Sequence, residues 1–151
     1  MAQSLSAIYL HLVFSTKDRR PCFNDGGFRH ELHSVLGGLA KSMECMPLEV
    51  GGVEDHVHLL IRLSKALSAS DFVKELKRNS NAWVKRTAPD LQDFAWQGGY
   101  AAFSVSVSNI EAVRHYIQKQ EEHHNKVGFK EELRALLKRH VVEWDERYVW
   151  D

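Results

Sequence analysis

The segment from Val53 to Leu63 constrains the fold of this chain more than any other part of it. It reads Val-Glu-Asp-His-Val-His-Leu-Leu-Ile-Arg-Leu and predicts a buried β-strand that carries two histidines, His56 and His58. Side chains two residues apart on a strand point to the same face, so both imidazoles project together and Val57 projects oppositely. Such a pair suits one divalent metal ion. Because the chain holds nine histidines, this pattern gains meaning only from what else reaches the pair.

Length and composition predict one globular domain, residues 1–151, with a sizeable core. Apolar residues make up 44% of the chain and charged residues 26%, which is ordinary for a soluble protein. The net charge of zero argues against a globally basic nucleic-acid-binding surface, although a local basic patch is compatible with it. Cys22 and Cys45 lack metal-site spacing and indicate reduced thiols in a cytosolic protein. We expect neither a signal peptide nor a membrane-spanning segment.

The other segments predict strands and helices in an order that suits an α+β fold. Strong alternation over residues 7–16 indicates a central strand. Residues 46–52 predict a strand that pairs with the histidine strand as a hairpin. Helices are predicted over residues 28–43, 68–87 and 129–139, and a Ser108-x-x-Glu111 capping box opens a further helix that runs to His124.

Three further expectations concern single segments. Residues 94–97 and 100–107 predict two strands joined by a hairpin turn at Gly98-Gly99. The C-terminal segment 141–151 is expected to dock on the body, because its large aromatic side chains are costly to expose to water. His11, on the first strand, is either a core histidine or lines the same site as His56 and His58.

The helix predicted over residues 68–87 carries a polar row opposite its apolar face. The row contains four basic residues and one amide: Lys74, Lys77, Arg78, Asn81 and Lys85. It is either a solvated surface or a contact for a phosphate backbone, and the lack of an acid within the row favours the second, since Glu75 lies to the side. Trp96 and Tyr100, beside the expected hairpin turn, either stack on bases or pack within the hairpin.

The helix that begins near Ser108 carries a second set of chemically active side chains. Tyr116 and Gln120 are one helical turn apart, and His123 follows on the same face. A tyrosine attacks a phosphodiester if a metal ion holds the phosphate and neutralises its charge. Two strand histidines and the Gln120 carbonyl would be three protein ligands for that ion, with positions left for phosphate oxygens.

At these positions the chain resembles the small single-tyrosine transposases of the HUH superfamily, the TnpA-type enzymes of single-strand insertion sequences. The resemblance is carried by Glu54-Asp-His-Val-His-Leu-Leu, Tyr116-Ile-Gln-Lys-Gln-Glu-Glu-His-His-Asn125 and Phe129-Lys-Glu-Glu132. It extends from the first strand to the C-terminal Asp145-Glu-Arg-Tyr-Val-Trp-Asp151, and so covers nearly the whole chain. Either main motif alone is unspecific, but both in this order and in so short a chain are quite specific.

The resemblance implies a ferredoxin-like core, in which helices pack on an antiparallel sheet. It implies that His56 and His58 are the metal-binding pair, Gln120 the third ligand and Tyr116 the nucleophile. The implied cofactor is Mg²⁺ or Mn²⁺, and the implied substrate is single-stranded DNA with terminal hairpins, cut through a 5′-phosphotyrosine with a free 3′-hydroxyl. The resemblance further implies a bacterial cytoplasmic homodimer, with the tyrosine helix of one subunit completing the histidine site of the other, and no membrane partner.

Several alternatives stay open at this point. Two imidazoles alone would suit zinc, whereas an amide oxygen with phosphate oxygens moves the preference toward Mg²⁺ or Mn²⁺. His123 and His124 are either a further source of ligands or a polar helix end. The protein could also be a domesticated relative that acts on palindromic host repeats, or a non-catalytic nucleic-acid-binding module using the basic row. A metal-dependent hydrolase would need Glu54 or Asp55 as its base.

Overall fold

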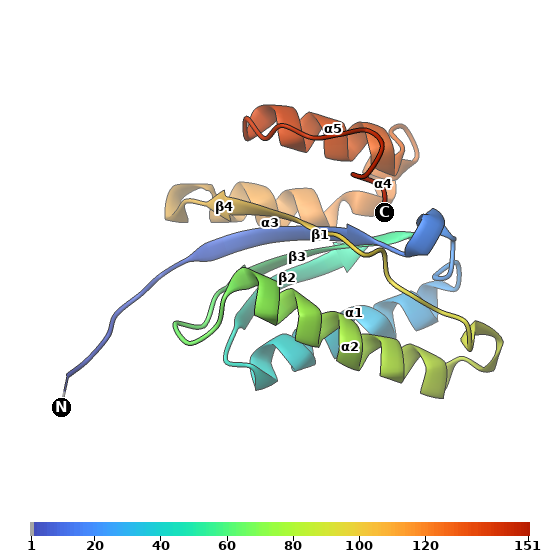
Figure 1. The fold of residues 1–151 in the computed structure, drawn as a ribbon, viewed down its shortest axis with the longest axis horizontal. Helices are drawn as coiled ribbons and strands as arrows, with labels where there is room; N and C mark the ends of the chain where they lie inside the picture. Colours follow the sequence, from blue (N-terminus) through green and yellow to red (C-terminus); the bar gives the residue numbers. More distant parts are fainter. Residues whose placement is uncertain (1) are drawn as a thin grey trace.

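The computed structural model describes residues 2–151 and contains a four-stranded antiparallel sheet with helices on both faces (Figure 1). A βαββαβ unit comes first: β1 (Tyr9–Ser15), α1 (Gly26–Ser42), β2 (Met46–Gly52), β3 (His56–Arg62), α2 (Ala69–Thr87) and β4 (Ala101–Val105). It is followed by α3 (Ile110–Gln118), α4 (Gln120–His124) and α5 (Phe129–Arg139). The strand order is β2-β3-β1-β4, and every neighbouring pair is antiparallel. This confirms the expected ferredoxin-like α+β fold.

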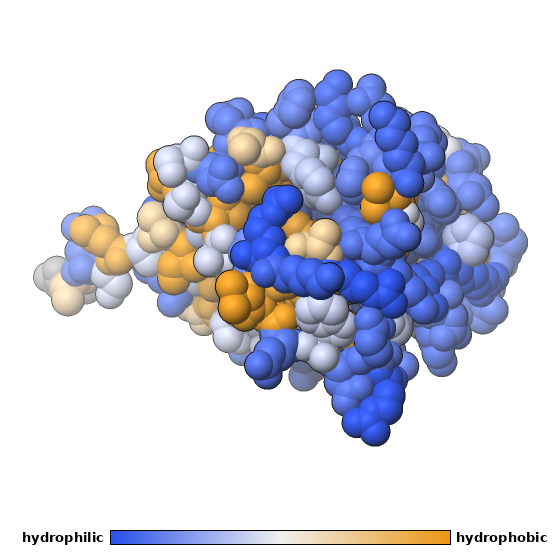
Figure 2. All heavy atoms as spheres, turned by 90° about the horizontal axis from the view of Figure 1, so that it is seen from above, coloured by the Kyte–Doolittle hydropathy of each residue, from blue (hydrophilic) through white to orange (hydrophobic). Residues whose placement is uncertain are grey.

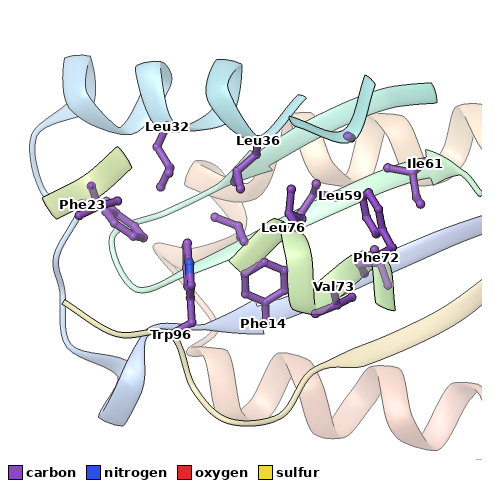
Figure 3. Packing of buried hydrophobic residues seen from close by; sticks show 14 of the residues in the cluster. Phe14, Phe23, Leu32, Leu36, Leu59, Ile61, Phe72, Val73, Leu76 and Trp96 are labelled. Atoms are coloured by element: carbon purple, nitrogen blue, oxygen red, sulfur yellow. The ribbon is translucent and has the colours of Figure 1, made fainter. Parts of the chain in front are cut away.

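The alternation of β1 and β3 divides the sheet into an apolar face and a mixed face. Leu12 and Phe14 of β1 share the apolar face with Leu59 and Ile61 of β3. Helices α1 and α2 cover that face, and Figure 3 shows their inward side chains pointing toward the sheet: Leu32, Leu36, Phe72, Val73 and Leu76. Val57 belongs to the same cluster, which confirms that it points away from the two histidines beside it.

The mixed face of the sheet is covered by α3 and α5 (Figure 1). Two smaller apolar clusters pack there, one around Ile117 of α3 and one around Leu133 of α5. Trp144 and Trp150 pack against the second cluster, so the C-terminal segment docks on the body as expected, while Tyr148 stays 63% exposed. The histidines of β1 and β3 also point to this mixed face.

Figure 2 views the molecule from the α5 side. Hydrophilic side chains cover most of this surface, and hydrophobic ones gather toward the N-terminal tail. Within residues 2–151, no helix combines the length and the apolar character that a membrane span requires.

The helix predicted from Ser108 to His124 is interrupted. A 3-10 turn over Val107–Asn109 precedes α3, and the Ser108 hydroxyl meets the Ser106 hydroxyl instead of capping the helix. Lys119, with φ −93° and ψ 12°, then separates α3 from α4. Gln120 is therefore the first residue of a short second helix rather than part of the tyrosine helix.

The hairpin expected around Gly98-Gly99 is wrong. Residues 94–97 form no strand beside β4, because Phe94 and Trp96 are buried in the apolar core instead. Trp96 makes a single bridge to Thr16, and its indole Nε1 donates to the Ser80 hydroxyl at 3.0 Å. β4 pairs with β1.

A close backbone approach sets the height of α3 above the sheet. Gly51 of β2 pairs with His58, and a Cβ atom at Gly51 would lie 2.8 Å from both the carbonyl oxygen and the Cγ2 of Ile117. Real Cβ contacts are essentially never that short, so only glycine lets α3 come so near. The approach places Tyr116, the neighbour of Ile117, over the histidine strand.

We predict that Gly51→Ala lowers the free energy of unfolding by about 1–3 kcal/mol, because the added methyl overlaps the backbone of α3. Gly38→Ala is the matched control, since nothing lies within 4 Å of a Cβ at this position in α1. Its expected effect is a gain of about 0.5–1 kcal/mol, as alanine favours a helix. Denaturant unfolding followed by circular dichroism measures both, and equal effects would contradict the close approach.

Candidate metal and tyrosine site

The two histidines of β3 are fully buried and each is held by its outer ring nitrogen. His56 Nδ1 lies 2.7 Å from Asp55 Oδ1, and His58 Nδ1 lies 2.8 Å from His11 Nε2. Bonds of this kind set which nitrogen of a ligating imidazole faces a metal ion. Both Nε2 atoms therefore face the space under α4 and α5. His11, which could have been core or site, is a buried residue that contacts the site.

A carboxylate from α5 meets these nitrogens. The Glu132 side chain is 1% exposed, and its Oε1 lies 3.2 Å from His56 Nε2 and 3.1 Å from His58 Nε2. His124, at the end of α4, brings a third imidazole, with its Nε2 3.0 Å from the same oxygen. Three ring nitrogens from two distant parts of the chain thus converge on one carboxylate oxygen.

Tyr116 and Gln120 meet the other oxygen of Glu132. The Tyr116 hydroxyl donates to Glu132 Oε2, and Gln120 Nε2 donates to the same atom at 3.0 Å. Gln120 Oε1 lies 3.3 Å from His56 Nε2. The structure therefore brings together all four residues that the sequence singled out, His56, His58, Tyr116 and Gln120, although α3 and α4 are separate helices.

Burial and neighbouring charges set the protonation of the histidines. Burial and the nearby His58 lower the pKa of His11 to about 3, and burial likewise lowers the pKa of His58. Burial also acts against a charged His56, but its bonds with Asp55 and Glu132 outweigh this and raise its pKa to about 9. At neutral pH His56 is therefore the charged partner of the buried carboxylate.

The same forces act on the acid and the phenol. Burial disfavours ionised Glu132, but the close imidazoles of His124, His56 and His58 prevail and hold its pKa well below the usual range. Burial and the adjacent Glu132 charge raise the pKa of Tyr116, so the hydroxyl is held as a neutral phenol. A cation bound beside Glu132 would replace the positive charge that the His56 proton supplies.

The donor set fits a divalent metal ion. Single ligand atoms of His56, His58, His124 and Glu132 all lie within 4.8 Å of one another. Imidazole nitrogens and a carboxylate oxygen are usual ligands for first-row metals. The nearby Gln120 carbonyl oxygen could join them. The structure thus contains a cluster able to hold a metal ion, larger than the three-ligand set expected from the sequence.

Two members of this cluster were not identified, or not decided, from the sequence. Glu132 carried part of the resemblance but no role, and His124 was left open between ligand and polar helix end. A usable signal for Glu132 lies in the pattern of α5, where Phe129, Glu132, Leu133 and Leu136 share one helical face. An acid on an otherwise apolar, buried face indicates a buried partner.

The basic row on α2 is less uniform than its sequence suggested. Lys77 Nζ turns inward and donates to the carbonyl oxygens of Gln97 and Gly99 at 2.9 and 2.6 Å. Arg78 pairs with Glu75 at 2.8 Å, so the expectation of an unbalanced row is wrong. Asn81 donates to the Phe94 carbonyl oxygen at 3.3 Å. The row lies in the α1–α2 layer, on the opposite side of the sheet from Tyr116 (Figure 1).

Two residues considered for DNA binding or catalysis are instead held in contacts within the protein. Trp96, considered for base stacking, is 7% exposed within the core, whereas Tyr100 remains 40% exposed. Asp55, considered as a hydrolytic base, is bound to His56 Nδ1.

Comparison with known proteins gives one family. A family model described as "Transposase IS200 like" matches residues 4–120. The transposase for insertion sequence element IS200 of Salmonella typhimurium is 31% identical over 116 residues, covering 73% of this chain and 74% of that protein. The corresponding transposase of Salmonella typhi matches to the same extent.

Two solved structures share the fold. A transposase candidate from Deinococcus radiodurans R1 superposes with a TM-score of 0.65 at 24% identity, over 80% of this chain and 95% of that one. A REP-associated tyrosine transposase bound to a REP hairpin superposes with a TM-score of 0.59 at 14% identity, over 84% and 76%. At these identities the two likenesses establish the fold.

Proposed function

The chain belongs to the IS200-like transposase family, and we propose that it cleaves and rejoins single-stranded DNA at the ends of an insertion sequence through a phosphotyrosine. One observation carries the proposal: the hydroxyl of Tyr116 lies in the same buried cluster as the strand histidines and the acid Glu132. A nucleophile beside a metal-binding cluster is the arrangement that phosphodiester transfer requires.

In this proposal Tyr116 is the nucleophile, with His56, His58 and Gln120 among the metal ligands. The Tyr116 oxygen forms a bond to phosphorus while the bond from phosphorus to the 3′-oxygen breaks. The phenol proton leaves along its hydrogen bond to Glu132 Oε2 and passes on to solvent water. The departing oxygen takes up a proton from water to become a free 3′-hydroxyl. A bound Mg²⁺ or Mn²⁺ supplies positive charge that neutralises the phosphate.

The 5′-phosphotyrosine would then be the substrate of the rejoining step. A second 3′-hydroxyl attacks the phosphorus and releases the Tyr116 hydroxyl, so one phosphoester replaces another and no external energy is needed. The resemblance favours single-stranded DNA with terminal hairpins as the substrate. The REP hairpin bound by one structural neighbour adds support for a hairpin ligand.

We expect Tyr116→Phe to abolish covalent attachment to DNA, because it removes the attacking oxygen and leaves the ring packing intact. Labelled single-stranded DNA with the terminal hairpin and flank of the native locus is incubated with manganese or with chelator and resolved on a denaturing gel. The wild-type protein should give a metal-dependent adduct, reduced at least about 10³-fold in the variant. Equal adduct from both proteins would exclude Tyr116 as the nucleophile.

The same gel separates the proposal from its alternatives. Salt-sensitive DNA binding without any adduct would indicate a non-catalytic binding module. A domesticated relative that acts on host repeats would form the adduct too, and is recognised by the absence of paired terminal hairpins around its gene.

Lys74 and Lys85 are the members of the basic row that we propose as contacts for the DNA backbone. Lys77 donates to backbone carbonyls and Arg78 pairs with Glu75, so both are less available to bind phosphate. Because the row lies across the sheet from Tyr116, it would contact the hairpin stem or the flanking strand rather than the phosphate that is cut.

Removing two phosphate contacts should reduce the slope of log binding constant against log salt by about 1.4 for a single strand. We therefore predict weaker and less salt-dependent DNA binding for Lys74→Ala/Lys85→Ala, whatever the DNA sequence. Fluorescence anisotropy across a salt series measures it. Lys41→Ala/Lys65→Ala makes the same charge change elsewhere and should leave the slope unaltered; equal slopes for all three proteins would make the row a solvated surface.

We also propose that the enzyme works as a homodimer with shared sites, as the resemblance implies. Within a single chain Tyr116 already reaches the cluster of its own histidines, so the arrangement of sites between subunits needs a direct test.

Mixing Tyr116→Phe with His56→Ala protein provides this test. If the tyrosine of one subunit serves the histidines of the other, half of the dimers are mixed and each contains one intact site. We expect adduct formation to recover to about a quarter of the wild-type level. Failure to recover, with subunit exchange verified by tagged copies, would place the whole site within one chain.

A further inference from the structure

We propose that Glu132 and His124 are themselves metal ligands and join His56, His58 and Gln120 around the cation. With three histidines in this set, Mn²⁺ binds in strong preference to Mg²⁺. The inference rests on the proposed function, because it concerns the same site. It goes beyond the family match, which ends at residue 120 and therefore includes neither α5 nor His124.

The first argument concerns His124. Its side chain is 8% exposed, and its Nε2 is a buried atom without a hydrogen-bond partner of suitable geometry, although Glu132 Oε1 lies only 3.0 Å away. A buried polar atom without a partner calls for an explanation. His123 Nε2 also has none, but it lies 3.4 Å from Glu132 Oε2 and outside the group of ligand atoms. The His124 Nε2 atom lies in the same group as the Nε2 atoms of His56 and His58. A role as metal ligands explains why all three nitrogens point to the same place.

The second argument concerns Glu132. Its carboxylate is buried on the apolar face of α5, between Phe129 and Leu133. A buried carboxylate is stable only when it is paired or coordinates a metal ion. Its two oxygens are used differently: Oε1 lies among the three histidine nitrogens, whereas Oε2 accepts from Tyr116 and Gln120. With Oε1 as a ligand atom, Oε2 still holds the tyrosine beside the cation.

The third argument concerns the groups behind the ligands. Asp55 engages the outer nitrogen of His56, and His11 engages that of His58. A carboxylate in this position is a usual partner of a metal-bound histidine, and the His11 imidazole orients His58 in the same way. The two strand imidazoles are therefore already oriented with Nε2 toward Glu132 and His124.

The donor set determines which cation is preferred. Mg²⁺ favours oxygen ligands, keeps several of its waters and gains little from imidazoles. Mn²⁺ accepts carboxylate oxygens as Mg²⁺ does, but as a first-row transition ion it also binds nitrogen ligands, less tightly than the later members of the series. Three imidazole nitrogens in the ligand set thus favour Mn²⁺ over Mg²⁺, whereas the two histidines and one amide expected from the sequence leave both ions open.

The test measures Mn²⁺ binding without DNA. Free Mn²⁺ is followed by its electron paramagnetic resonance signal during titration of the full-length protein, with and without a hundredfold excess of Mg²⁺. The variants are Glu132→Gln and His124→Asn, with Glu131→Gln and the exposed His30→Asn as control variants outside the group of ligand atoms. Circular dichroism establishes that each variant is folded, and Glu132→Asp, which keeps the charge, replaces Glu132→Gln if that protein does not fold.

We expect Glu132→Gln and His124→Asn to weaken Mn²⁺ binding at least about 10-fold to 100-fold, as for other changes at metal sites. The two control variants should stay within about threefold of wild type, and excess Mg²⁺ should displace little Mn²⁺. Wild-type affinity in both folded ligand variants, or ready displacement by Mg²⁺, would overturn the inference.

A His56→Ala variant separates this inference from the proposed function. If His56→Ala loses Mn²⁺ binding while Glu132→Gln and His124→Asn retain it, the metal site stands and only the added ligands fail. If the wild-type protein binds no Mn²⁺, both the added ligands and the metal-dependent reaction fail together.

Discussion

The convergence of three imidazoles on the buried Glu132 carboxylate is the interaction on which the rest of this structure depends. A carboxylate on the apolar face of α5 cannot be buried without partners, and the partners come from β3 and α4. The contact therefore ties α5 and the segment before it to the mixed face of the sheet. The net charge of zero therefore does not reflect an even distribution of ionisable groups, because several of them gather in this buried cluster.

The ferredoxin-like core supplies the rigid part of this arrangement. Alternation along β3 sends the apolar side chains into the α1–α2 layer and the two histidines to the other face. The close approach of α3 to Gly51 then sets Tyr116 over those histidines. The strand β3 determines where its two imidazoles lie, and the helices α3 and α5 bring Tyr116 and Glu132 to them.

Membership of the IS200-like transposase family makes DNA cleavage the activity to be explained. The buried cluster supports a chemical role for the tyrosine, while the basic row on α2 is partly used for internal contacts such as Lys77 with Gln97. These observations favour the catalytic proposal over a binding module that relies on the row alone.

Local sequence patterns identified most of the helices and strands and four of the six residues that meet at the site. Alternation identified β1, a buried run with two histidines identified β3, and its expected hairpin partner was β2. Helical spacing identified α1, α2 and α5. The spacing of His56 with His58 and of Tyr116 with Gln120 identified residues that meet in space. Tertiary structure alone decided that residues 94–97 enter the core rather than a hairpin, that the tyrosine helix ends at Gln118, and that Glu132 and His124 join the histidines. The physical reason is that periodicity reports which face of an element is buried, whereas the partners on that face come from segments as far apart as His58 and Glu132, which only packing brings together.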